Sequence, residues 1–271
     1  KRFPERTFNF GIAEQEMVSA AAGFASCGKI PIATAYGFLL SFRACEQVRD
    51  DICYQNMNVK LMSTHTGLSM AAAGTTHHST EDIAVMRSFA NMTIVAPSDS
   101  VETVKAVEAV IEYPGPVYLR MGRGSLESVY NEDYEFIVGK AVKIREGGDV
   151  TIISYGVMVA ESLRAAALLT EQGIEARVLN MHTIKPLDRE AVLQAAVDTG
   201  CIVTAEEHTV IGGLGEAVAG YLSETKPVPV VRVGIQDQFC GIGDEEGLRK
   251  KLGLTAEAIV AAAVKARALR S

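Results

Sequence analysis

The chain has 271 residues, of which 48% are hydrophobic and 22% charged, and this balance fits a globular protein of one large or two smaller domains. A net charge of -7 argues against a nucleic-acid partner or a polybasic membrane surface, and no apolar run reaches the roughly 20 residues of a membrane helix. The five cysteines are odd in number and scattered without a CxxC pair, which predicts neither disulfides nor a zinc site and favours the cytoplasm.

Predicted strands and helices alternate along the chain. Short runs rich in Val and Ile are mostly uninterrupted, as expected for strands that are covered on both faces. These runs are residues 30–33, 59–62, 93–96, 117–120, 150–154, 176–180, 201–205 and 230–233. Longer amphipathic segments lie between them. Asp99 with Glu102 has the spacing of a capping box before one such segment, and Ser79 with Asp82 marks another helix start.

This alternation predicts an α/β architecture. A polar stretch at residues 124–149 separates two such series of strands and helices. We therefore predict two domains, residues 1–138 and 139–271, each a largely parallel sheet flanked by helices.

Glu14 is the first residue with a candidate chemical role. It precedes residues 17–25, an Ala- and Gly-rich segment typical of a tightly packed helix. The helix dipole stabilises a carboxylate at this position, so a helix-start charge is the simpler interpretation from spacing alone. Further along, Tyr36, Phe38 and Phe42 follow the first predicted strand, where aromatic residues are more often core than cofactor contacts.

Three of the five histidines, His65, His77 and His78, lie in one segment rich in Gly and Ala. Such a composition is typical of a loop whose backbone approaches a ligand. His77 and His78 also precede a predicted helix start, where free N–H groups bind anions or polar groups. A zinc site would need a further ligand at suitable spacing, which the segment lacks. Loop histidines that bond to the backbone are the alternative.

Arg120 and Arg123 lie at the end of the strand predicted at residues 117–120. Ligands of open α/β sheets bind at the carboxyl ends of strands, so an arginine here is a candidate for binding phosphate, with a surface salt bridge as the alternative. Near the C-terminus, Gly212-Gly213-Leu214-Gly215 lacks the full spacing of a phosphate-binding turn, and we predict a plain helix start there.

Several segments, taken together and in order, carry a family resemblance. They are residues 10–15 around Glu14, 43–49, the pair Thr64-His65 with residues 74–77, 96–99, 119–124, 183–188 and 206–215. Over nearly the whole chain they resemble the C-terminal half of the transketolase family, which some organisms make as a separate chain. The resemblance implies a pyrimidine-binding domain followed by a transketolase C-terminal domain.

The resemblance also implies thiamine diphosphate as cofactor and transfer of a two-carbon ketol unit between sugar phosphates. Glu14 would hydrogen-bond to N1′ of the cofactor's aminopyrimidine. His65 and His77 would be catalytic donors to oxygens of the substrate, and Arg123 would bind the sugar phosphate. The other cofactor contacts that it implies are Ile12, Tyr36, Phe38, Leu39 and Arg43, and a further substrate contact is His78.

The sequence lacks the Gly-Asp-Gly motif, followed at a distance by Asn, that binds Mg²⁺ and the diphosphate in this family. The resemblance therefore implies a partner, an N-terminal transketolase subunit that carries the Mg²⁺ ligands, in an α2β2 heterotetramer. Family members also have a strand and a helix before the segment at residues 3–6. We expect this element to be missing from the N-terminus of the sequence.

Two positions depart from the family pattern. Ala73 stands where the family has an acidic residue that contacts a hydroxyl of the acceptor, which predicts a variant sugar phosphate, such as a branched one. His78 stands where the family usually has Gln, and it is either a substrate contact or a spacer.

Three alternatives share parts of this pattern. Deoxyxylulose-phosphate synthase resembles the chain in residues 43–47 and 120–124, and the beta subunit of 2-oxo acid dehydrogenases has the same pair of domains. The third alternative is a non-catalytic partner subunit. Consumption of pyruvate would distinguish the first two enzymes from a transketolase.

Overall fold

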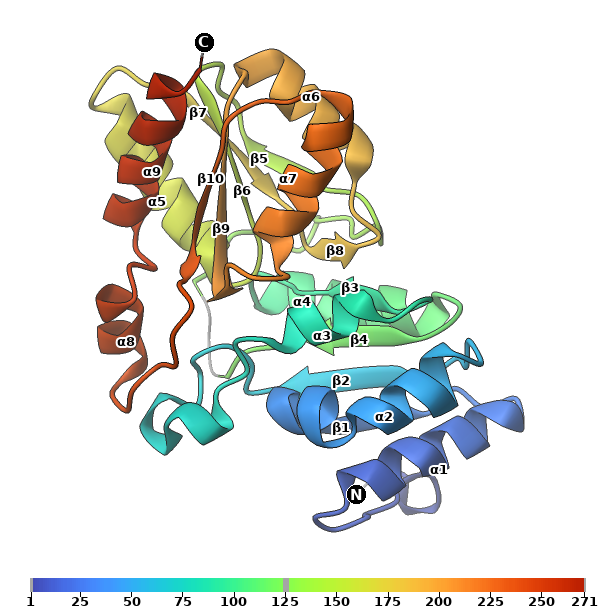
Figure 1. Ribbon diagram of the computed structural model, residues 1–271. Coiled ribbons are helices and arrows are strands. Elements are labelled where there is room, and N and C mark those ends of the chain that lie inside the picture. The colour runs from blue at the N-terminus through green and yellow to red at the C-terminus, as the bar shows by residue number, and fades with distance from the viewer. Residues whose placement is uncertain (1, 124–126, 271) are drawn as a thin grey trace.

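The computed structural model describes residues 2–123 and 127–270. The chain forms two α/β units, drawn in blue to green and in yellow to red in Figure 1. We call the part up to residue 138 the N-terminal half and the part from residue 139 the C-terminal half. The predicted α/β fold with two largely parallel sheets is confirmed. The exact position of the domain boundary stays a prediction.

The first sheet has the strand order β1-β2-β4-β3-β8. Strands β1 to β4 pair in parallel, whereas β8 comes from the C-terminal half and pairs antiparallel with β3. The two halves are thus joined by backbone hydrogen bonds as well as by side chains. The strands are β1 Ile32–Tyr36, β2 Lys60–Thr64, β3 Thr93–Val95, β4 Val117–Arg120 and β8 Thr183–Lys185.

The second sheet has the order β10-β9-β6-β7-β5, with β5 antiparallel to β7 at one edge and the other pairs parallel. Helices α5 and α9 cover one face and α6 and α7 the other (Figure 1). The strands are β5 Val142–Arg145, β6 Val150–Ser154, β7 Ala176–Asn180, β9 Ile202–Thr209 and β10 Val230–Ile235.

The α-helices are α1 Glu14–Ser26, α2 Cys45–Gln47, α3 Asp82–Ser88, α4 Ser100–Glu112, α5 Met158–Thr170, α6 Arg189–Thr199, α7 Leu214–Thr225, α8 Glu245–Lys251 and α9 Ala256–Ala268. Two π-helical segments, η2 Leu39–Arg43 and η3 Val48–Cys53, lie on either side of α2. Short 3-10 turns are η1 Pro4–Arg6, η4 Ala71–Ala73 and η5 Thr75–His77. None of the helices in the described ranges is both long and apolar enough to span a membrane.

The strand predictions are wrong mainly where polar residues lie inside a strand. β9 continues through Glu206, Glu207 and His208, whose side chains are buried and accept hydrogen bonds from residues outside the strand. The apolar runs do not predict β5 and β8, because each is short and contains lysine or arginine. β1 begins two residues later than expected and ends at Tyr36.

One predicted helix start is confirmed and the other is wrong. The carboxylate of Asp99 accepts a hydrogen bond from Glu102 N at 2.7 Å and caps α4. Ser79 does not cap α3, whose N-cap is Glu81. Asp82 instead faces the sheet, where its Oδ2 accepts hydrogen bonds from Tyr118 and Arg120.

The predicted connection at residues 124–149 includes a strand and makes hydrogen bonds to both halves. Residues 124–126 lie outside the described residues, and β5 occupies part of the remainder. Tyr134 donates to Glu102 Oε1 at 2.8 Å, and Asn180 donates to Tyr130 Oη at 2.9 Å. The connection is therefore packed between α4 and the second sheet.

Candidate active site

Glu14 is the first residue of α1 and is held in place by a single arginine. Its side chain is almost fully buried, with only 8% of the residue exposed, and Oε2 accepts a hydrogen bond from Arg43 Nη1 at 2.9 Å. Arg43 is the last residue of η2, and half-buried Leu39 is the first. No described residue donates a hydrogen bond to the other oxygen, Oε1. The arrangement fixes the carboxylate and leaves one oxygen for another donor.

An aromatic row joins the two candidate catalytic histidines. The ring of Tyr36, at the end of β1, lies 4.5 Å from that of His65 and 6.2 Å from that of Phe38. The ring of Phe38 lies 5.2 Å from that of His77. We call these four residues the aromatic row. It is partly exposed, so segments far apart in the sequence offer rings to one surface.

His65 and His77 belong to a segment, residues 65–81, that we call the histidine loop. It is closed at its base by a pair of backbone hydrogen bonds between Gly67 and Ser79, each 3.0 Å long. His65 itself, directly after the end of β2, has a positive φ of 56°, in the left-handed region that few residues other than glycine adopt.

The electrostatics at His65 favour the neutral imidazole. Burial and, secondly, the nearby positive charge of Arg123 lower the pKa of His65. Its Nδ1 lies 3.0 Å from Thr64 Oγ1. A neutral histidine beside an arginine can donate to or accept from a polar ligand without adding a second positive charge.

Arg120 and Arg123 have different environments. Arg120 is buried, and its Nε donates to Asp82 Oδ2 at 2.9 Å while Nη2 reaches the carbonyls of Ser79 and Glu207. Arg123 is exposed near His65. Of the two candidates, only Arg123 is accessible to a phosphate.

The remaining predicted positions are divided between the surface and the interior. Ile12, two residues before Glu14, is 91% exposed. Ala73 is exposed in the histidine loop, whereas His78 is buried behind it. Burial lowers the pKa of His78, against a smaller opposing effect of the Ala71 carbonyl. Direct contact of His78 with a substrate stays a prediction.

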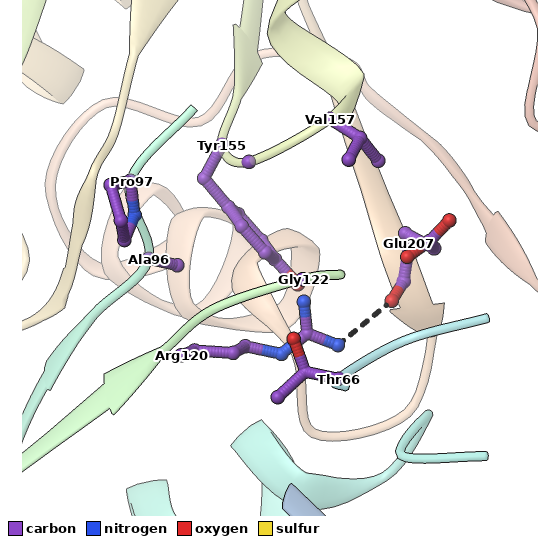
Figure 2. A pocket seen from close by; sticks show the side chains of 9 residues that line it. Thr66, Ala96, Pro97, Arg120, Gly122, Tyr155, Val157 and Glu207 are labelled. Atoms are coloured by element: carbon purple, nitrogen blue, oxygen red, sulfur yellow. Dashed lines mark hydrogen bonds between the residues drawn. The ribbon is translucent and has the colours of Figure 1, made fainter. Parts of the chain in front are cut away.

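A cavity of about 20 Å³, the size of a single water molecule, marks the contact between the two halves (Figure 2). Tyr155 and Val157 enter it from one side and Arg120 and Thr66 from the other. No sequence pattern predicts that Tyr155 lines this cavity, because its position depends on packing against Arg120, which is distant in the sequence.

The glycine turn before α7 holds one of the chain's own carboxylates. Glu206 Oε2 accepts from Leu214 N at 2.8 Å and Oε1 from Gly215 N at 2.9 Å. A Cβ on Gly213 would lie 2.1 Å from Glu206 Oε2, which explains the glycine. The prediction of a plain helix start is confirmed. Among the described residues, no group of three or more His, Cys, Asp or Glu side chains is arranged to hold a metal ion.

Comparison with known proteins gives matches over nearly the whole chain. Residues 1–128 match the family model of the transketolase pyrimidine-binding domain, and residues 139–259 match that of the transketolase C-terminal domain.

Two relatives are named as transketolase subunits. The chain is 45% identical over 263 residues to the 6-deoxy-6-sulfo-D-fructose transketolase subunit SqwH of Clostridium sp. (strain MSTE9), covering 97% of this chain and 82% of the relative. It is 42% identical over 266 residues to an apulose-4-phosphate transketolase subunit of Phocaeicola vulgatus, covering 98% of this chain and 85% of the relative.

A solved structure described as a split gene transketolase, inactive beta4 tetramer, is 45% identical and superimposes with a TM-score of 0.91. The match covers 99% of this chain and 86% of that one.

Proposed function

Because this chain belongs to the transketolase family, we propose that it is the C-terminal subunit of a split transketolase, which transfers a two-carbon ketol unit between sugar phosphates. The observation that carries the proposal is the aromatic row, which joins His65 and His77 on one exposed face beside Arg123.

The residues present fit thiamine diphosphate. Glu14 is buried and fixed by Arg43, yet one of its oxygens is left for a hydrogen bond from a ring nitrogen of the cofactor. Tyr36 and Phe38 offer partly exposed rings for stacking, and Ile12 and Leu39 offer apolar contacts. When bound, this cofactor supplies the carbon nucleophile that accepts the ketol unit.

The chain's own residues would hold protons and orient the sugar. Glu14 would keep a proton shared with N1′ of the aminopyrimidine. His65 and His77 would donate to substrate oxygens on which negative charge develops, and the neutral imidazole favoured at His65 suits this role because it has one N–H to give. Arg123 would bind the phosphate with its forked guanidinium.

The rest of the site would come from a partner. We propose that an N-terminal transketolase subunit supplies the Mg²⁺ and diphosphate ligands, in an α2β2 assembly. The strong exposure of Ile12 next to Glu14 supports a protein surface covering this end of α1.

All five cysteines are free thiols, which supports the cytoplasm as the compartment.

The sugar is proposed to be a variant one. Ala73 is exposed in the histidine loop, and it replaces the acidic residue that binds a hydroxyl of the ordinary acceptor in the family. Its methyl group cannot make that hydrogen bond. Relatives named for apulose 4-phosphate and for a sulfonated fructose support this view.

The test is reconstitution of the chain with its genomic neighbour, thiamine diphosphate and Mg²⁺, followed by assay of ketol transfer from a panel of sugar phosphates. Activity should need both chains. Glu14→Gln should lower kcat at least about a thousandfold, because Gln keeps the bond to Arg43 but cannot hold the shared proton. Glu16→Gln, on an exposed position of the same helical turn, is the matched control and should leave activity unchanged.

Other outcomes lead to the alternatives. Consumption of pyruvate with release of CO₂ would identify a synthase or dehydrogenase type of reaction. Full activity of Glu14→Gln in the assembled pair would support the alternative of a non-catalytic partner subunit.

A further inference from the structure

The histidine loop packs against the C-terminal half, although it belongs to the N-terminal half in sequence. Leu68 is fully buried, and it joins the same apolar cluster as Val203 of β9, Ile235 of β10 and Leu248 of α8. Ala71, in η4, belongs to this cluster too. The segment that carries His65 and His77 therefore has its buried side in the core of the other half.

One carboxylate of the C-terminal half bonds directly to the loop backbone. Glu207, in β9, is almost fully buried, and its Oε2 accepts a hydrogen bond from Leu68 N at 3.2 Å. Gly67 makes room for it: with φ at +60°, a Cβ there would lie 1.9 Å from Glu207 Oε2. The loop and the carboxylate are matched in shape as well as in hydrogen bonding.

An ion network extends from this carboxylate to two residues of α8. Glu207 Oε1 accepts from Arg249 Nε at 2.7 Å, and Arg249 also pairs with Glu245. Burial raises the pKa of Glu245, while Arg249 and Arg123 oppose that rise. Arg123 thus lies within electrostatic range of the network that holds the loop.

Further contacts hold the tip of the loop to the segment before α8. Thr75 Oγ1 donates to the carbonyl of Cys240, and Gly74 lies against the side chain of Ile242. α8 itself packs beside η4 (Figure 1).

We propose that Glu207 is a positioning residue, through which the C-terminal half sets the geometry of the histidine loop and hence of His65 and His77. This role is separate from chemistry, because the two carboxylate oxygens of Glu207 accept from Leu68 N and Arg249 Nε rather than facing a ring of the aromatic row with a free oxygen. Its catalytic consequence rests on the proposed function, whereas its effect on the loop does not.

The test uses two variants of the full chain. Glu207→Gln keeps one oxygen for Leu68 N and loses the charge that faces Arg249. Glu207→Met has similar length and no acceptor. Hydrogen–deuterium exchange of the amides at residues 66–80 should be roughly tenfold faster in Glu207→Met, as expected for loss of a buried charged acceptor, and intermediate in Glu207→Gln.

Glu161 is the matched control. Its Oε2 accepts from Ala256 N at 2.9 Å and its Oε1 from Arg164 Nη2 at 2.5 Å, which is the same pairing of a backbone amide and an arginine, but within the C-terminal half. Glu161→Gln and Glu161→Met should leave exchange in the histidine loop unchanged, even where they lower the Tm.

In the reconstituted enzyme, Glu207→Met should lower kcat/KM for the sugar phosphate roughly tenfold or more and leave the affinity for thiamine diphosphate unchanged. The kcat/KM of Glu207→Gln should lie between those of Glu207→Met and wild type. Unchanged loop exchange in Glu207→Met, or an equal change in Glu161→Met, would overturn the proposal. If the wild-type pair transfers no ketol unit, the proposed function fails, and loop exchange alone decides the role of Glu207.

Discussion

Arg120 and Arg123 are three residues apart and have opposite roles. Arg120 is buried and donates to Asp82 and to carbonyls of both halves, so its guanidinium is ion-paired and hydrogen-bonded inside the protein. Arg123 is exposed beside His65. A buried, paired arginine cannot turn to a ligand without leaving Asp82 unpaired, which costs several kcal/mol. Substrate binding at this strand end therefore depends on Arg123.

Replacement of Arg123 by Met should raise KM for a phosphorylated substrate about tenfold to a hundredfold, because charge-assisted hydrogen bonds contribute roughly 1.5–3 kcal/mol. kcat should change less, since phosphate is bound equally in the ground state and the transition state. Steady-state kinetics of the reconstituted enzyme measure both constants. Arg145→Met, in β5, is the control and should have no effect. A fall in kcat with constant KM would contradict the assignment.

At the scale of single elements, the N-terminus of α4 does more than start a helix. Asp99 Oδ1 caps the helix through Glu102 N, while Oδ2 accepts from Val129 N and Tyr130 N at 2.7 and 2.8 Å. One carboxylate thereby fixes both a helix end and the segment that leads into the C-terminal half.

Asp99→Ala should lower the free energy of unfolding by about 3 kcal/mol or more, because the cap is lost and two further N–H groups lose their acceptor. Thr255→Ala removes a cap that makes a single bond, to Ala258 N, and should cost about 1 kcal/mol. Denaturant unfolding of both variants measures the difference. Equal losses would show that the bonds to Val129 and Tyr130 add nothing to stability.

At the scale of the whole molecule, the two halves meet through buried titratable groups. His208 Nε2 accepts from Ala84 N at 3.2 Å, so Nδ1 carries the proton and donates to the carbonyl of Thr209 at 2.7 Å. Burial lowers the pKa of His208 from 6.5 to about 4. The unfolded chain therefore binds more protons than the folded chain between these values, and stability falls as the pH is lowered from 6.5 towards 4.

The contribution of His208 to this loss is up to about 3 kcal/mol. Glu206 acts in the opposite direction, because burial raises its pKa to about 7 and stability then falls as the pH rises. The informative quantity is the difference between wild type and His208→Gln in the free energy of unfolding at each pH. As the pH is lowered from 6.5 to 4, the free energy of unfolding of His208→Gln should rise relative to that of wild type by up to about 3 kcal/mol. A constant difference would show that His208 is not held neutral in the folded protein.

The sequence by itself determined the fold class, the order of most strands and the family, because these depend on local periodicity and on motifs that are contiguous in the chain. It also selected Glu14, His65, His77 and Arg123 as candidates. The histidines and the arginine were candidates from their place in a loop and at a strand end, whereas a chemical role for Glu14 came from the resemblance.

Only the tertiary structure decided which polar residues are structural. β8 joins a sheet whose other strands precede it in the chain by more than sixty residues, and no local pattern predicts such a pairing. The buried Glu206, Glu207 and His208 interrupt an apolar strand pattern. Glu207 and His208 are satisfied by backbone amides of the N-terminal half, and Glu206 by the turn before α7. The free energy of burying a polar group depends on its partners, and these are set by the tertiary fold, which for Glu207 and His208 means the packing of the two halves.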